Sequence, residues 1–276
     1  YSIRPLGNGL HAIIELDENQ FPPDLEPLKN NVKQQFEKQS LTLTNPNVKA
    51  TVNTNFSIFP FYAKFRVMVL YTPAANAAVA SMSGLVNLAI AETEQGYKNS
   101  GVFIDIDLVG PWFVNFTETS AYTDVARLAG TADGYIDYIH AWRTWFKADV
   151  VVMIEDVPGY CGVADTIMAN VDEAFAIVDY DCATGYYSFA HEIGHLQGAR
   201  HNPEVDLTNV PYPYGHGYQG PSNKFRTIMA YNCSGGCPRW NYWSNPYKKV
   251  WITSWPWLFS VPTGTVDKHH NARVLN

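Results

Sequence analysis

Hydrophobic residues follow a regular pattern from about residue 65 onwards, in which short continuous runs alternate with longer runs of helical spacing. The continuous runs predict three buried strands, at 65–71, 102–109 and 148–154. The helical spacing predicts one long helix over 73–97 and a helical region over 124–146 that is interrupted near 130–134. Strand, helix, strand, helix, strand is the order of a three-layer α/β/α sandwich around a mostly parallel sheet.

Two short extended pieces follow around a polar loop, at 162–164 and 174–178. One of them is expected to form an antiparallel edge strand of a mixed sheet. A peptide could add to that edge as a further strand through main-chain hydrogen bonds. The next helix is expected to begin near Gly185 and to end at Gly198, because glycine adopts the left-handed backbone that reverses a chain.

Residues 1–62 differ from the rest, since they are rich in Asn, Gln, Pro and charge and contain no cysteine. Their pattern predicts a short strand over 10–16, a helix over 25–40 and an extended linker over 45–60. We therefore expect an N-terminal extension before a main domain at 63–276. Two interpretations of the extension are open: a small subdomain packed on the rest, or a propeptide that covers the active site.

Composition places the chain among folded globular proteins, with 46% hydrophobic and 16% charged residues among 276. The net charge of −7 argues against a nucleic-acid partner, because phosphate binding needs clustered Lys and Arg. No apolar run reaches the length that spans a bilayer. We expect a monomer with no membrane span.

The four cysteines are Cys161, Cys182, Cys233 and Cys237. A structural zinc site is a poor fit because the usual pairs of CxxC knuckles are missing. Two disulfides fit better, with Cys233 joined to Cys237 and Cys161 to Cys182, although this is one of three pairings. Disulfides imply an oxidising compartment, which suits a secreted protein.

The run SFAHEIGHLQGARH at 188–201 carries the candidate chemistry. His191 and His195 are four residues apart, so they share one helix face and can bind one Zn²⁺. A turn at Gly198 lets His201 reach the same ion, which leaves one coordination position open, as in a catalytic site. Glu192 lies next to a ligand and can act as the general base on a zinc-bound water.

HExxHxxGxxH followed by a methionine turn is the metzincin signature, and Met229 lies 28 residues after His201. Met229 is expected to form an apolar floor under the histidines. Tyr231 resembles the tyrosine of the astacins and serralysins, which implies a phenol that binds the metal at rest and helps the transition state. A packing role for Tyr231 stays open.

From residue 66 to the end the chain resembles the bacterial peptidyl-Asp metalloendopeptidases, an adamalysin-like or reprolysin-like branch of the metzincins, through short runs such as RTIMAYNC at 226–233. Adamalysins proper place Asp after the third histidine, whereas this chain has Asn202. The resemblance implies a zinc cleft between an upper subdomain at 63–198 and a lower one at 199–276. It also implies propeptides that silence zinc with a Cys or Asp side chain, for which Asp17 and Asp24 are the candidates here.

The same resemblance implies cleavage on the amino side of acidic residues. Such a preference needs a cation in the pocket, and Arg239 is the candidate because arginine can hold a carboxylate through two parallel hydrogen bonds. A surface arginine stacked on Trp240 is the alternative.

We therefore expect a secreted, bacterial zinc endopeptidase that acts on proteins or peptides through attack by Glu192-activated, zinc-bound water. The rival interpretation is an inactive, zinc-containing adhesin or glycoprotein-binding domain on the same scaffold, with an aromatic patch at 251–258 and the N-terminal extension as its working parts. Ca²⁺ has only weak candidates, which are the carboxylates Asp105, Asp107, Asp179 and Asp181.

Overall fold

A mixed five-stranded sheet forms the centre of the computed structural model, which describes residues 2–29, 62–254 and 256–276. The strand order is β4-β3-β5-β7-β6, and all neighbours are parallel except the edge strand β6, which runs antiparallel to β7. The strands are β3 (Ala63–Tyr71), β4 (Ile104–Phe113), β5 (Val150–Glu155), β6 (Gly162–Ala164) and β7 (Phe175–Asp179). The predicted sheet is confirmed.

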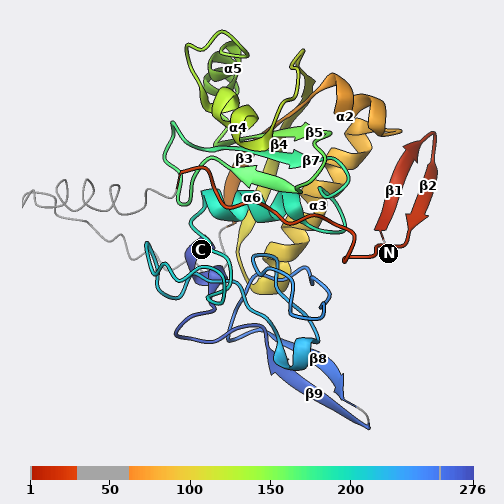
Figure 1. The fold of residues 1–276 in the computed structure, drawn as a ribbon, viewed down its shortest axis with the longest axis vertical. Helices are drawn as coiled ribbons and strands as arrows, with labels where there is room; N and C mark the ends of the chain where they lie inside the picture. The colour runs from red at the N-terminus through yellow and green to blue at the C-terminus, as the bar shows by residue number, and fades with distance from the viewer. Residues whose placement is uncertain (1, 30–61, 255) are drawn as a thin grey trace, which may run out of the picture.

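Helices cover both faces of this sheet, as a parallel sheet requires (Figure 1). Side chains of β5 alternate between the two cores: Val150 and Val152 face one core, and Val151 and Met153 face the other. The helices of the first core are α3 (Met82–Ser100) and α6 (Ser188–Leu196), and those of the second are α4 (Ala121–Ala129) and α5 (Tyr138–Phe146). The three-layer α/β/α class is therefore confirmed.

The single helix predicted over 73–97 is wrong in one respect, because the chain forms α2 (Pro73–Ala78) before α3. Ser81 lies between them with an extended backbone, and its hydroxyl accepts a hydrogen bond from Gly84 N at 3.2 Å. Serine is a strong N-cap, so a second helix starts here although the apolar spacing continues. The interruption predicted near 130–134 is present between α4 and α5.

The lower part of the molecule has little regular structure below α6 (Figure 1). It contains the hairpin of β8 (Lys249–Ser254) and β9 (Trp257–Pro262), and the short helix α7 (Asn271–Leu275). Trp251 and Trp257 are 65% and 68% exposed, so the aromatic patch lies on the surface. The structure contains the two predicted disulfides, Cys161–Cys182 and Cys233–Cys237.

The N-terminal residues form the hairpin of β1 (Ser2–Gly7) and β2 (Leu10–Ile14) and then cross in front of α6 as the red-brown segment of Figure 1. The helix predicted over 25–40 is wrong for residues 25–29, which are extended. Leu25 N and Leu28 N donate to the carbonyls of Gly162 and Ala164, at 2.8 and 3.0 Å. Residues 25–29 therefore bond to the edge strand β6 instead of forming the helix that their apolar spacing predicts. The remainder of that prediction, and the linker over 45–60, lie outside the described residues.

None of the helices within these described ranges combines the length and the apolar character that crossing a membrane requires.

Candidate active site

Three histidine side chains converge beneath the sheet. α6 carries His191 and His195 one turn apart, and the chain reverses at Gly198, whose φ of 104° favours glycine. His201 then approaches from outside the helix. Its Nε2 lies 3.0 Å from Nε2 of His191 and 3.0 Å from Nε2 of His195. Within the described ranges, this is the one group of three or more His, Cys, Asp or Glu residues whose ligand atoms all lie within 4.8 Å of one another.

The opposite ring nitrogen of each histidine has its own acceptor. Nδ1 of His191 lies 2.9 Å from Ile228 O, and Nδ1 of His195 lies 2.9 Å from Ala199 O. Nδ1 of His201 lies 2.7 Å from a carboxylate oxygen of Glu26. These contacts place each ring proton on Nδ1, so three Nε2 lone pairs face one another.

Converging lone pairs repel unless a cation lies between them, so the three histidines fit a divalent metal. Burial lowers the pKa of His191 to about 3 and holds that of His195 well below the ordinary value. Both rings therefore stay neutral at pH 7, which is the protonation state in which imidazole binds metals. His216, on the other side of His201, donates from Nδ1 to the His201 carbonyl at 2.7 Å and braces the third ligand.

Glu192 follows the first histidine on α6 and points toward the edge strand. Its side chain is fully buried, and neither carboxylate oxygen has a hydrogen-bond partner among the described residues. Burial, and secondly the charge of Asp24, raises its pKa well above the usual value. A Cβ built on Gly162 of β6 would lie 2.8 Å from Glu192 Cγ and Oε1, so the carboxylate occupies space that only a glycine leaves free.

Met229 lies in a tight turn closed by a hydrogen bond from Ala230 N to Thr227 O at 3.0 Å. It is fully buried in the same core as α6. A Cβ on Gly194, between the two helical histidines, would lie 2.8 Å from Met229 Sδ and 2.5 Å from the Trp243 ring. The thioether therefore packs directly under the helix.

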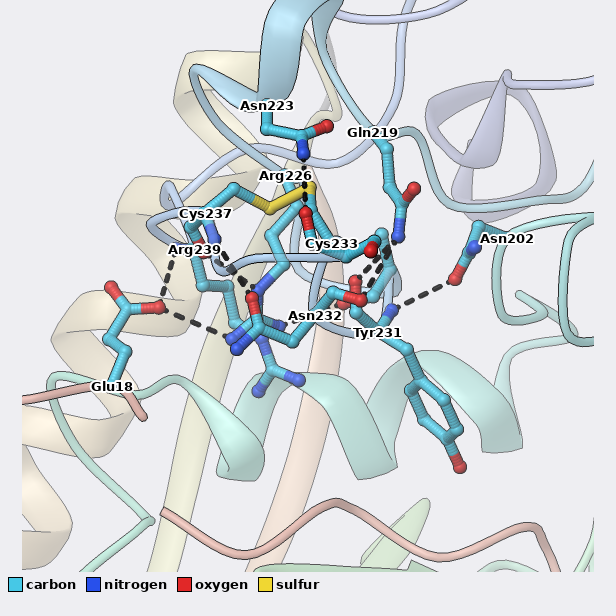
Figure 2. Close-up of a disulfide and its surroundings, with 12 residues drawn as sticks. Glu18, Asn202, Gln219, Asn223, Arg226, Tyr231, Asn232, Cys233, Cys237 and Arg239 are labelled. Carbon is cyan, nitrogen blue, oxygen red and sulfur yellow. Dashed lines mark hydrogen bonds and ion pairs between the residues drawn. A yellow bond between two sulfur atoms is a disulfide. The ribbon is translucent and has the colours of Figure 1, made fainter. Parts of the chain in front are cut away.

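Tyr231 lies against the third histidine, with 4.1 Å between ring centroids. Its backbone N–H donates to Asn202 Oδ1 at 2.9 Å, and its hydroxyl donates to the main-chain carbonyl of Asp24 at 2.8 Å. In Figure 2 the phenol points down toward the N-terminal chain. Burial, with Glu26 and Asp24, raises the phenol's pKa, so the hydroxyl stays a donor.

Arg239 is buried rather than exposed, so the alternative of a surface arginine stacked on Trp240 is wrong. Its guanidinium lies over the Tyr186 ring at 4.2 Å from the centroid, while Nη1 donates to Tyr186 O at 2.9 Å. Nη2 donates to a carboxylate oxygen of Asp24 at 2.6 Å. Burial alone would lower the pKa of Arg239, but Asp24, Tyr186 and Glu18 together outweigh burial and the pKa is raised.

Sequence patterns did not identify several residues that complete this site. Arg226, also buried, lies behind Arg239, and Glu18 accepts from both Arg226 Nη2 at 3.2 Å and Arg239 N at 2.7 Å (Figure 2). Glu18 belongs to no motif, and Arg226 entered the sequence argument only as the first residue of the run at 226–233. Asn202 stood out only as a departure from the adamalysin pattern, and its bond to Tyr231 N now gives it a role.

A mostly parallel sheet above a helix that presents two histidines and a glutamate, with a third histidine after a glycine turn, is the design of a metzincin-type metallopeptidase. Residues 62–244 match Metallo-peptidase family M12. The chain belongs to this family.

Two bacterial relatives agree with the family. The peptidyl-Asp metalloendopeptidase of Stenotrophomonas maltophilia is 44% identical over 280 residues, which cover 100% of this chain and 63% of the relative. That of Pseudomonas fragi is 43% identical over 157 residues, 56% of this chain and 83% of the relative. The chain thus spans less than two thirds of the Stenotrophomonas protein.

One solved chain, described as "Structure of a chaperone-substrate complex", shares the fold with a TM-score of 0.58 at 19% identity. The match covers 78% of this chain and 33% of that chain.

Proposed function

We propose that this protein is a secreted zinc-dependent endopeptidase that hydrolyses peptide bonds before acidic residues. The observation that carries the proposal is the convergence of three Nε2 atoms at the helix that also carries the buried carboxylate of Glu192. His191, His195 and His201 would hold the ion. Bound Zn²⁺ would supply Lewis acidity, which polarises a carbonyl and makes a water molecule acidic near neutral pH.

The chain's own residues would then handle protons and position the peptide. Glu192 takes a proton from the attacking water and delivers it to the leaving amine, the two transfers of general base and general acid catalysis. The Tyr231 hydroxyl is a donor close to the third histidine, within reach of a developing oxyanion. The edge strand β6 offers main-chain groups to an extended peptide.

A preference for acidic residues follows from Arg239. The carbonyl and the ring of Tyr186 hold the guanidinium in place. Its Nη2 group donates a hydrogen bond to the carboxylate of Asp24. A buried cation left without an anion is costly, so a pocket of this kind favours peptides with Asp or Glu. The name of the bacterial relatives, peptidyl-Asp metalloendopeptidase, supports the same preference.

Two further parts of the proposal concern where and in what form the protein acts. Its two disulfides favour an oxidising environment outside a bacterial cytoplasm. We propose that it acts as a monomer, because the proposed site is built from one chain; light scattering of the purified protein tests this.

The test of the function is hydrolysis of a quenched peptide with one internal Asp, by the full chain carrying Asp24→Ala so that residue 24 does not compete for Arg239. A chelator should abolish hydrolysis and Zn²⁺ should restore it. Glu192→Gln should lower kcat at least about 100-fold, since general bases contribute that much. Asp172→Asn, an exposed carboxylate distant from the histidines, is the matched control and should change nothing. Chelator-resistant hydrolysis, or full activity of Glu192→Gln, would contradict the proposal.

A further inference from the structure

We propose that residues 15–29, called here the covering segment, are a built-in competitive inhibitor that mimics an acidic substrate, with Asp24 in the place of the substrate's acidic side chain. This rests on the proposed function of the same site. The inhibitor acts at the specificity pocket of Arg239 and at the edge strand, rather than by placing a carboxylate on the metal.

The covering segment occupies the edge strand that a peptide would use. Cys161 N donates to Pro23 O at 3.0 Å, Leu25 N donates to Gly162 O at 2.8 Å, and Leu28 N donates to Ala164 O at 3.0 Å. The ladder continues at Lys29, whose N–H donates to Asp165 O at 2.7 Å. These bonds use up the main-chain groups of β6 that would otherwise bind an extended peptide.

Asp24 fills the cationic pocket. One carboxylate oxygen lies 2.6 Å from Arg239 Nη2, and both side chains are buried. The same oxygen lies 3.7 Å from His191 Nδ1, which is the ring nitrogen turned away from the three converging Nε2 atoms. The carboxylate is therefore bound as a side chain in a pocket, whereas the family resemblance led us to expect it on the metal.

The covering segment also engages the other groups of the proposed site. Asp24 O accepts the Tyr231 hydroxyl at 2.8 Å, and Glu26 lies 2.7 Å from His201 Nδ1. Glu18 binds Arg226 and the Arg239 backbone, as Figure 2 shows. Three acidic side chains of one short segment thus meet the cations and the third histidine of the cleft, which is the charge complementarity of a substrate mimic.

The register explains why the covering segment inhibits instead of being cut. Cleavage before an acidic residue would break the Pro23–Asp24 bond, but the Pro23 carbonyl is held by Cys161 N. Tyr231 instead binds the carbonyl of Asp24, one residue later. The covering segment also runs parallel to β6, as its pairing of Lys29 with Thr166 shows. The Pro23 carbonyl, which hydrolysis before Asp24 would attack, is therefore bound by Cys161 N and not by the proposed oxyanion donor Tyr231.

The experiment compares full-length chains that carry Glu192→Gln, so that binding is measured without turnover. The probe is a fluorescent peptide with one internal Asp, followed by anisotropy in the presence of Zn²⁺. Asp24→Ala should bind it at least tenfold more tightly than the parent, because the pocket is vacated. Asp17→Ala is the matched control: Asp17 lies in the same segment, but among the described residues its carboxylate accepts hydrogen bonds from its neighbours Asn19 and Gln20, so affinity should not change.

Exchanging the charges of Arg239 and Asp24 distinguishes two causes of altered binding: a vacated pocket and a damaged fold. Arg239→Glu should expel the covering segment through repulsion of Asp24, so a fluorescent peptide with Lys in place of Asp should bind. Adding Asp24→Lys should restore the pair and exclude the Lys peptide again by at least tenfold. A loss of structure would not be reversed in this way.

If the Asp peptide binds the Glu192→Gln chain and the same chain with Asp24→Ala equally tightly, the covering segment is not an inhibitor of the pocket, whatever the hydrolysis assay shows. In active chains, the Asp24→Ala variant should hydrolyse the quenched peptide at least tenfold faster than wild type at low substrate. If the anisotropy series behaves as expected while no chain hydrolyses peptide, the inhibitor at the pocket stands and the proposed catalysis fails.

Discussion

At the scale of single residues, the position of the proposed base Glu192 depends on the missing side chain of its neighbour Gly162. The buried side chain of Glu192 packs closely against the edge strand β6, and this packing helps to set its position. Gly162 provides the space for this side chain: a Cβ there would lie 2.8 Å from Glu192 Cγ and 3.0 Å from Ile177 O. The backbone oxygen cannot move without breaking the pairing of β6 and β7, so the glutamate would have to yield.

Gly162→Ala should therefore lower kcat about 10- to 100-fold, because displacement of a catalytic group by about 1 Å costs this much. The metal content should stay the same, since the three atoms nearest to the added Cβ belong to Glu192 and Ile177 and not to a histidine. Peptide hydrolysis in the Asp24→Ala background, with zinc analysis and thermal unfolding of the same samples, tests this. An unchanged kcat with Gly162→Ala would mean that Glu192 is positioned by something other than β6.

At the scale of elements, the sequence predicted those strands and helices whose structure depends on residues close together in the chain. The runs that became β3 and β5 are apolar because both sheet faces are covered, and the histidine motif works through helix spacing and one glycine turn. Residues 25–29 do not form the start of the helix expected over 25–40, because their backbone N–H groups bond to carbonyls along and just beyond the edge strand β6 instead. The sequence allowed Arg239 to be proposed as the cation of the pocket. Its partner Asp24 lies 215 residues away in the sequence, and a local pattern cannot predict a contact between residues so far apart.

The loop closed by Cys233 and Cys237 is an element that supports specificity. Its chain holds Arg226 through Cys237 O at 3.3 Å and Pro238 O at 2.9 Å, and leads directly into Arg239. Asn232, just before the loop, accepts a hydrogen bond from Cys237 N through its Oδ1 at 2.9 Å (Figure 2). The disulfide therefore orders the backbone that carries the pocket's cation.

Replacing both Cys233 and Cys237 with serine should cost about 2 kcal/mol of stability, the value expected for so short a loop. The larger effect should be on recognition: KM for an Asp peptide should rise about 3- to 10-fold, while kcat stays within about twofold. An otherwise identical Asn peptide is the internal control, because its KM should hardly change. The same ratio of kcat/KM for the Asp and Asn peptides in both chains would show that the loop does not position Arg239.

At the scale of the whole molecule, the sheet buries acidic groups that oppose its stability. Glu155 ends β5 with both carboxylate oxygens buried and without partners among the described residues. Burial, and then the charges of Asp124, Glu118 and Asp179, raises its pKa to about 9. The Tyr160 phenol, whose pKa the Glu155 charge helps to raise, is a further titratable group beside it.

Because its folded-state pKa lies above the unfolded value of 4.5, Glu155 binds its proton more tightly in the folded chain. Its contribution to stability is therefore complete below about pH 4.5 and is lost as the pH rises toward 9, with a cost on the order of 3 kcal/mol at pH 7. Glu155→Gln keeps the shape without the ionisation, so its melting temperature should exceed that of wild type by about 5–10 °C at pH 8 and by little at pH 5. Thermal unfolding of both chains at these two pH values isolates this residue, because all other groups are shared. A difference that does not grow with pH would mean that Glu155 has an ordinary pKa and that the acidic cluster is open to water.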